Sequence, residues 1–315
     1  MTEYVLLGDI SSGSSLKLAL AGRGQRPKTT AHYACNSLQS FSEAIQDFLR
    51  DQANPRLLGA AFSAAGWEKG GVIQLPNHGF SIDRSEVRTL LGVQRVNLVN
   101  DFVAKALAIP RLEDSERFKI CGGNPVSEQV IAVIGPHNGL GLSALAPDGT
   151  GNWTAMPTEG GHSDLAPTDD FEHAVLKVLI AKYGHVSRER VISIPGLVDI
   201  WGALAKIDGD DASVPSAEEI IAMASADDTR AHQAIDLSMG WFAAMASDVA
   251  LILGARGGVY LSGDLLDMIG DMFDIEAFVA RYSAKGRLSG YVNEIPVFRT
   301  TATDMEIIGL ATLFD

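Results

Sequence analysis

Short apolar runs alternate with stretches of helical spacing over the first third of the chain, and this alternation restricts its fold most strongly. Residues 4–7 and 16–20 are rich in β-formers and flank a polar Ser/Gly segment, which predicts a hairpin with a polar tip. From Leu38 onward the apolar residues follow helical spacing. The apolar runs 57–62 and 96–99 are typical of strands buried inside a helix-covered sheet. We therefore predict an α/β fold for this part of the chain.

A second series of elements begins near Pro110, where a proline and charged residues interrupt a helical pattern. Residues 130–134 and 140–145 predict two further strands around a turn that contains glycine. Helical patterns and a last apolar strand follow, over residues 171–183, 187–191, 196–207, 231–253 and 257–261. A chain of 315 residues is long for a single core, so two packed domains are expected.

The charge balance bears on the partners of the protein. The formal net charge is -14 and the 25 Lys and Arg residues are scattered, which argues against nucleic acid as a partner. The negative charge would also repel anionic membranes, and no uncharged apolar run approaches the roughly 18 residues of a spanning helix. The N-terminus has no basic leader before its apolar stretch. We expect a cytoplasmic protein without nucleic-acid or membrane partners.

Asn100 and Asp101 follow an apolar strand and precede the helical run 102–108. The C-terminal end of a buried strand is the edge where open α/β sheets bind ligands, which places the Asp101 carboxylate well for a general base. Asn or Asp in this position can also cap the next helix, a contribution of about 1 kcal/mol. The two roles are compatible, and position alone leaves both open.

Two further candidates lie in the second half of the chain. In Glu159-Gly160-Gly161-His162, glycines would let the backbone approach a ligand while the flanking side chains hydrogen-bond adjacent hydroxyl groups, as in sugar recognition. The alternative is a solvated turn with surface side chains. Further ligands at zinc-binding spacing are lacking, so no metal site is predicted. Glu189 lies near the start of a short helix, where a capping role is the alternative.

Two predicted hairpin tips, at residues 9–15 and 135–141, could present backbone N–H groups to an anion as glycine-rich phosphate loops do. Neither ends in the Gly-Lys-Ser/Thr of a Walker loop, and Gly139-Leu140-Gly141 is too short for a dinucleotide fingerprint. The residues by themselves therefore predict a ligand cleft with carboxylates, without identifying the ligand.

A series of ordered motifs, through nearly the whole chain, resembles the bacterial glucokinase family of sugar kinases. The motifs are Gly8-Asp9-Ile10, Val99-Asn100-Asp101-Phe102 with Ala108-Ile109-Pro110, Gly139-Leu140-Gly141, residues 157–167 around Glu159-Gly160-Gly161-His162, residues 184–191, Pro195-Gly196-Leu197, Lys285-Gly286-Arg287 and Ile295-Pro296-Val297. The resemblance implies a two-lobed α/β sugar-kinase fold of the actin-like, ribonuclease-H-like type with a central ligand cleft. It also implies a small α/β domain of residues 1–110 plus 300–315, a large α+β domain of residues 111–299, and a homodimer.

The same resemblance implies roles for individual residues. Asn100, Glu159, His162 and Glu189 correspond to residues that line the glucose site, and Asp101 corresponds to the catalytic base that takes the proton from the 6-hydroxyl group. All five sugar-side positions match the family. The resemblance further implies ATP with Mg²⁺ as the phosphoryl donor, without a dedicated protein metal site. The residues matching the nucleotide side are Asp9, Gly13, Asn138, Gly139 and Gly263.

On the nucleotide side the sequence departs from the family pattern. Serines replace glycines in the first phosphate loop, which adds side chains where the backbone should approach phosphate. Asn138 replaces a threonine, Asp264 replaces a glycine, and Ser63 and Trp67 replace a proline and an aspartate. The start of the last helix keeps one glycine, Gly309.

Three functional hypotheses follow from this comparison. The first is an ATP-dependent glucokinase that converts glucose to glucose 6-phosphate. The second is a sugar-binding sensor or partner protein without turnover, with eroded phosphate loops. The third is a kinase for another hexose or with another donor. Asp9 and Asp101 both persist, which favours the enzyme because a base without chemistry to perform would be expected to drift.

Overall fold

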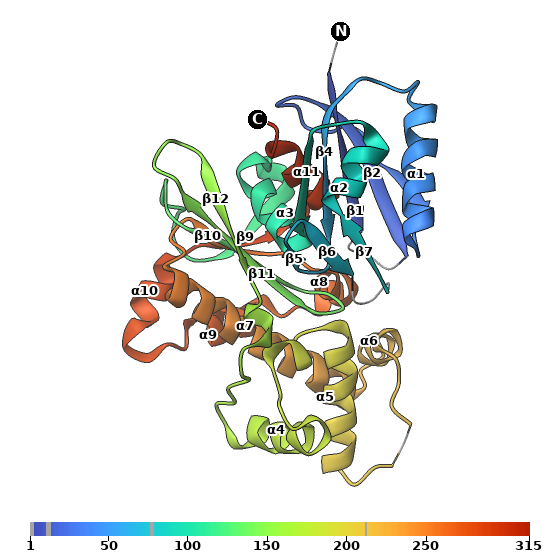
Figure 1. Ribbon diagram of the computed structural model, residues 1–315. Coiled ribbons are helices and arrows are strands. Elements are labelled where there is room, and N and C mark those ends of the chain that lie inside the picture. Colours follow the sequence, from blue (N-terminus) through green and yellow to red (C-terminus); the bar gives the residue numbers. More distant parts are fainter. Residues whose placement is uncertain (1–2, 11–13, 76–78, 212) are drawn as a thin grey trace. The chain divides into compact units, whose positions relative to one another are not determined.

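The computed structural model describes residues 3–10, 14–75, 79–211 and 213–315 (Figure 1). The chain divides into two compact units. The small unit contains Met1–Glu116, Ala155–Pro157 and Ala302–Asp315, and the large unit contains Arg117–Thr154 and Thr158–Thr301. The small unit has a five-stranded and a three-stranded sheet (β5-β6-β7), the large unit has a six-stranded sheet, and each unit has its own buried core, so each is described by itself.

A five-stranded sheet forms the centre of the small unit. Its strand order is β3 (Ala31–Ala34), β2 (Ser15–Gly22), β1 (Tyr4–Ile10), β4 (Leu57–Ala64) and β8 (Arg95–Asn100). The predicted hairpin is confirmed, because β1 and β2 pair antiparallel from Tyr4 with Gly22 to Asp9 with Lys17. β1, β4 and β8 run parallel, so their carboxyl ends meet at one edge of the sheet. The hairpin tip, including Gly13, lies outside the described residues.

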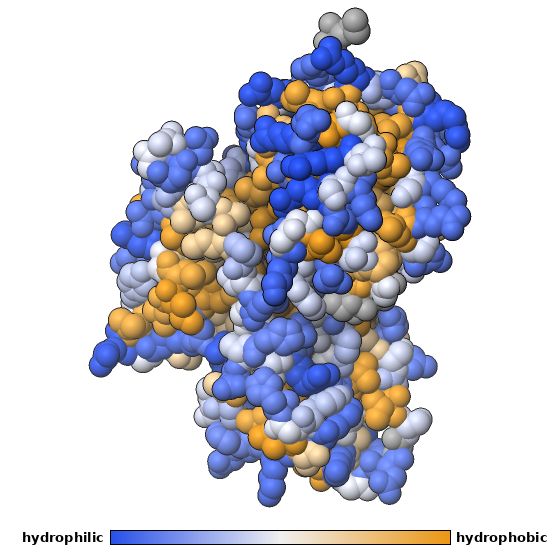
Figure 2. Space-filling model, in the orientation of Figure 1, coloured by the Kyte–Doolittle hydropathy of each residue, from blue (hydrophilic) through white to orange (hydrophobic). Residues whose placement is uncertain are grey.

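Helix α1 (Leu38–Asp51) is amphipathic, as its apolar spacing predicts. It begins at Ser37, whose side chain accepts the N–H of Ser40 in a capping box. Its buried face includes Phe41 and Ile45, while hydrophilic residues cover its outer side in Figure 2. The remaining elements of this unit are β5 (Glu68–Lys69), β6 (Val72–Leu75), β7 (Phe80–Asp83), α2 (Arg84–Leu91), α3 (Asp101–Ala108), η1 (Ile109–Arg111), η2 (Asp114–Glu116) and α11 (Met305–Thr312).

Helices α3 and α11 come from opposite ends of the chain and pack against each other in the small unit. Gly309 makes this close approach possible: a Cβ atom at this position would lie 1.8 Å from the backbone oxygen of Ala104. The apolar side chains of α11 then join β1 and β4 in one buried cluster that includes Val5, Leu7 and Ile307. The last helix is thereby part of the N-terminal unit's core.

The six-stranded sheet of the large unit repeats part of this topology. Its order is β12 (Trp153–Thr158), β11 (Leu140–Pro147), β10 (Ile131–Pro136), β13 (Gly258–Leu261), β14 (Val297–Thr300) and β9 (Arg117–Cys121). β10 pairs antiparallel with β11 and parallel with β13, as β1 does with β2 and β4. The predicted second strand pair is thus confirmed.

Helices supply most of the large unit's core. They are α4 (Asp170–Tyr183), α5 (Ile194–Ile207), α6 (Ala217–Ser225), α7 (Thr229–Leu253), α8 (Asp264–Ile269), α9 (Ile275–Ser283) and α10 (Ser289–Glu294), with short 3-10 turns η3 (Gly160–His162), η4 (Arg188–Arg190), η5 (Gly270–Met272) and η6 (Gly286–Leu288). α7 has the length and apolar composition of a membrane span, but 61% of its most apolar window is buried inside the protein. Trp241 and Phe242 of α7 are among the largest fully buried side chains, which is typical of a core helix.

Candidate active site

The carboxyl ends of β1, β4 and β8 bring polar side chains together at one edge of the small unit's sheet. Asp9, the penultimate residue of β1, pairs in register with Ser63 of β4, and the next residue of β4 pairs with Asn100. The Ser63 hydroxyl donates a hydrogen bond to Asp9 Oδ1 at 2.6 Å, and both side chains are buried. Ser63 therefore lies within a strand, where it holds the Asp9 carboxylate.

Asn100 caps helix α3, and Asp101 is its first residue. The Asn100 Oδ1 atom accepts the N–H of Phe102 at 2.9 Å, while its Nδ2 donates to the Gly66 carbonyl at 3.0 Å. Of the two roles considered for these residues, the cap thus belongs to Asn100. Asp101 is 5% exposed, and its carboxylate lies at the helix N-terminus, where the helix dipole favours negative charge. The position is compatible with a general base.

Glu189 and His162 lie close together in the large unit. Glu189 Oε2 accepts the backbone N–H of Leu140 at 2.9 Å, and its Oε1 lies 3.6 Å from His162 Nε2. Ser187, not Glu189, occupies the N-cap position of the short 3-10 turn. Glu189 thus lies in the first turn after this N-cap, and its carboxylate reaches across to the start of β11. Gly139 leaves room for it, since a Cβ atom there would lie 2.6 Å from Glu189 Oε2.

The Glu159-to-His162 segment is anchored by its second glycine. Gly161 is buried, and a Cβ atom at this position would lie 2.1 Å from the Leu140 carbonyl oxygen. Glu159 and His162 flank the turn and are exposed, so both are accessible to a ligand. The segment is thus held against β11 by its backbone while its two polar side chains remain outside, which differs from a freely solvated turn.

The residues matched to the nucleotide side of the large unit lie at the ends of β10 and β13. Asn138 is exposed in the β10–β11 turn, where its side chain and backbone are accessible to an anion. Gly263 is required by packing, because a Cβ atom there would lie 2.3 Å from the Pro136 carbonyl oxygen. The substituted residue Asp264 has its Oδ2 2.9 Å from His137 Nδ1.

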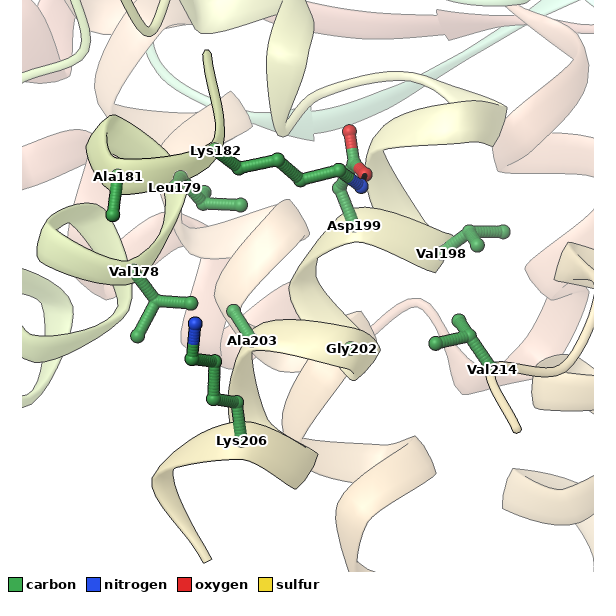
Figure 3. Close-up of a pocket in the computed structure, with 10 residues that line it drawn as sticks. All are labelled: Val178, Leu179, Ala181, Lys182, Val198, Asp199, Gly202, Ala203, Lys206 and Val214. Atoms are coloured by element: carbon green, nitrogen blue, oxygen red, sulfur yellow. Dashed lines mark hydrogen bonds and ion pairs between the residues drawn. The ribbon is translucent and has the colours of Figure 1, made fainter. Parts of the chain in front are cut away.

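The pocket drawn in Figure 3 is separate from the predicted site residues. In the part of the chain that the structure describes, no three His, Cys, Asp or Glu side chains converge as metal ligands. The pocket in Figure 3 lies between α4 and α5 of the large unit, with a volume of about 450 Å³. Its charged residues are Lys206 and the ion pair of Lys182 with Asp199, whose Nζ and Oδ1 atoms are 2.7 Å apart. None of the predicted site residues lines it.

Comparisons with known proteins agree with the motifs. The family model described as Glucokinase matches residues 6–315. A glucokinase-like protein of Caulobacter vibrioides is 38% identical over 304 residues, which cover 96% of this chain and 94% of that protein. A glucokinase of Aromatoleum aromaticum is 36% identical over 314 residues, with 98% and 94% covered. The crystal structure of a glucokinase from an Antarctic psychrotroph matches with a TM-score of 0.88 and 27% identity, over 100% of this chain and 99% of that one. The predicted actin-like sugar-kinase fold is confirmed, and the chain belongs to the glucokinase family.

Proposed function

We propose that the protein is an ATP-dependent glucokinase, which transfers a phosphoryl group to the 6-hydroxyl group of glucose. The observation that carries this proposal is the buried Asp101 carboxylate at the start of α3, whose capping role is taken by Asn100. A carboxylate at this place is of the chemical type that serves as a general base. It lies at the carboxyl edge of a parallel sheet, the usual ligand edge of such folds.

The roles proposed on the sugar side are given for each unit by itself. In the small unit, Asp101 takes the proton of the 6-hydroxyl group and Asn100 orients the sugar through the hydrogen-bonding capacity that its amide retains. In the large unit, Glu159, His162 and Glu189 bind the remaining hydroxyl groups. A carboxylate accepts hydrogen bonds from two hydroxyls, and an imidazole donates or accepts one, so the set suits a polyol.

On the phosphate side, the residues proposed to bind the nucleotide are Asp9 and Gly13 of the first hairpin, and Asn138, Gly139 and Gly263 of the large unit. Backbone N–H groups and the Asn138 amide supply neutral donors to phosphate oxygens. ATP supplies the phosphoryl group, and Mg²⁺ is proposed to arrive with it, because this ion binds mainly through substrate phosphates and water. Catalysis beyond the base then rests on positioning and charge neutralisation.

A coupled assay for glucose 6-phosphate with ATP and Mg²⁺ tests the proposal. We expect turnover that requires both glucose and ATP. Thermal stabilisation by glucose without turnover would instead identify a sugar-binding sensor, since ligand binding to the native state raises apparent stability. Replacing glucose by mannose or galactose, and ATP by pyrophosphate, distinguishes a kinase for another hexose or donor.

Substitution of Glu189 tests the sugar-binding role within the large unit. We expect Glu189→Gln to raise the KM for glucose about tenfold with little change in kcat. A hydrogen bond from a sugar hydroxyl to a charged carboxylate stabilises the complex by about 1.5 kcal/mol, and its loss corresponds to a factor of about ten in binding. Initial rates over a range of glucose concentrations measure the effect. Glu276→Gln, which changes an exposed carboxylate on α9, is the control and should leave KM unchanged. A KM for Glu189→Gln within twofold of the unsubstituted protein would remove this residue from the site.

The proposal extends to the setting of the enzyme. A cytoplasmic homodimer that acts at the entry of glucose into glycolysis fits the family resemblance and the net charge of -14. Light scattering coupled to size exclusion measures the oligomeric state, with a mass near twice 33.5 kDa expected.

A further inference from the structure

Lys105 places a buried positive charge beside the proposed base. It follows Asp101 by four residues in α3, so the two side chains lie on the same face of the helix. The Lys105 side chain is 6% exposed, and its Nζ lies 3.2 Å from Glu306 Oε1, whose side chain is 10% exposed. The Nζ atom also lies 4.7 Å from the centre of the Phe102 ring. An ammonium group is thus held between α3 and α11, inside the small unit.

Negative charges from three elements act on this ammonium. Lys105 is influenced by Glu306 of α11, by Asp101 of its own helix and by Asp9 of β1. Burial acts to lower the pKa of Lys105, but these three negative charges outweigh it and raise the pKa above its ordinary value. Lys105 therefore stays charged at neutral pH.

Glu306 has a matching environment. Burial acts to raise its pKa, yet the positive charges of Lys105 and of Lys17 on β2 outweigh burial and lower the pKa. Lys17 Nζ in turn lies 3.0 Å from Asp304 Oδ1, at the residue before α11. The cluster therefore holds carboxylates and ammonium groups in their charged forms side by side within the small unit.

A buried ion pair is not an efficient way to stabilise a helix contact. Well-packed apolar residues of similar volume often give equal or greater stability, because two charges must be removed from water. Packing alone therefore does not account for this pair. Its position one turn from Asp101 suggests a role in the charge state of that carboxylate.

We propose that Lys105 is a positioning residue for catalysis: its buried ammonium, one helical turn from Asp101 and paired with Glu306, keeps the Asp101 carboxylate ionised. The proposal rests on the proposed function, in which Asp101 is the base. A buried carboxylate without a nearby cation would hold its proton to higher pH and lose its capacity as a base. Lys105 prevents this while it remains shielded from substrate phosphates by its own burial.

Removing the positive charge of Lys105 and the negative charge of Glu306, each in its own variant, distinguishes an electrostatic role of Lys105 from a structural one. Lys105→Met removes the positive charge, so the acidic limb of the pH profile of kcat/KM should move up by about one pH unit. Glu306→Gln removes the negative charge and keeps Lys105, so the limb should move down or stay in place. Lys177→Met, at an exposed lysine of α4, is the control and should leave the limb unchanged. Limbs that move in the same direction in both single variants, or in neither, would overturn the proposal.

The double variant Lys105→Met/Glu306→Gln keeps the test valid if Lys105→Met does not fold. It removes both charges of the Lys105–Glu306 pair, and it differs from Glu306→Gln only at residue 105. Its acidic limb should therefore lie about one pH unit above that of Glu306→Gln. Coincident limbs for these two variants would also overturn the proposal.

A second readout separates failure of this inference from failure of the proposed function. The titration of the Asp101 carboxyl carbon, followed by ¹³C NMR, reports its pKa without turnover and should show the same shifts. If Asp101→Ala retains full turnover, Asp101 is not the base and the proposed function is wrong in that respect. If Asp101→Ala is inactive, but Lys105→Met changes neither the acidic limb of the pH profile nor the ¹³C titration of Asp101, then only the positioning role of Lys105 is wrong.

Discussion

Asp101→Asn is expected to lower kcat for glucose phosphorylation by about 10² to 10⁴, the usual contribution of a positioned general base. The amide keeps the size of the side chain but cannot accept the proton of the 6-hydroxyl group. The KM for glucose should change little, because the large-unit residues proposed to bind the sugar are intact. Steady-state rates at saturating ATP, together with glucose binding by calorimetry, measure both quantities.

Asp170→Asn is the matched control for this substitution. Asp170 is also the first residue of an α-helix, α4, but it is exposed. The control therefore reports the loss of a helix-dipole interaction, about 0.3–1 kcal/mol of stability, without loss of a base. If Asp101→Asn retained more than a tenth of the kcat, proton transfer would have to be assigned elsewhere.

Gly309→Ala is expected to destabilise the small unit by about 3 kcal/mol, the upper end of overpacking costs. The added methyl group would lie 1.8 Å from the Ala104 carbonyl oxygen, so α3 and α11 must separate. Because Asp101 begins α3, the displacement of this helix should also lower the kcat at temperatures at which the protein is still folded. Hydrogen exchange at the amides of α3 and α11 measures the local free energy of opening.

Gly240→Ala is expected to change stability in the opposite direction, because this glycine has free space around it. Gly240 lies inside α7, and a Cβ atom there would meet nothing within 4 Å. Alanine should stabilise this helix by up to about 1 kcal/mol, because glycine loses more backbone freedom on folding. Equal effects of the two substitutions on stability would contradict the packing role assigned to Gly309.

Local sequence patterns predicted the central elements well where apolar spacing was unambiguous. The β1–β2 and β10–β11 hairpins, the buried strands β4 and β8, and helices α1, α4, α5 and α7 are all confirmed. Short elements were missed, among them β9 and β14, because runs of four or five residues carry too little periodicity to be distinguished. The segment 187–191 was predicted as helical and forms only the 3-10 turn η4.

The candidate site shows the same division. Asp101 and Glu189 were identified from their positions and from the family motifs, but their contacts could not be read from the chain. Whether Asn100 or Asp101 caps α3, and whether Glu189 caps a turn or reaches Leu140, depends on side-chain direction. The sequence did not indicate a role for Lys105 beyond its spacing from Asp101, because its partner Glu306 is 306 − 105 = 201 positions away in the sequence.

The sequence by itself determined the α/β class, the order of the main strands and helices, and the family, since these depend on local periodicity and on ordered motifs. Only the tertiary structure decided that α11 packs on α3, that Ser63 holds Asp9, and that Lys105 and Glu306 form a buried ion pair. Each of these contacts joins segments distant in the chain, and its energy depends on burial and on distances of a few ångströms. Neither quantity is encoded in the spacing of neighbouring residues.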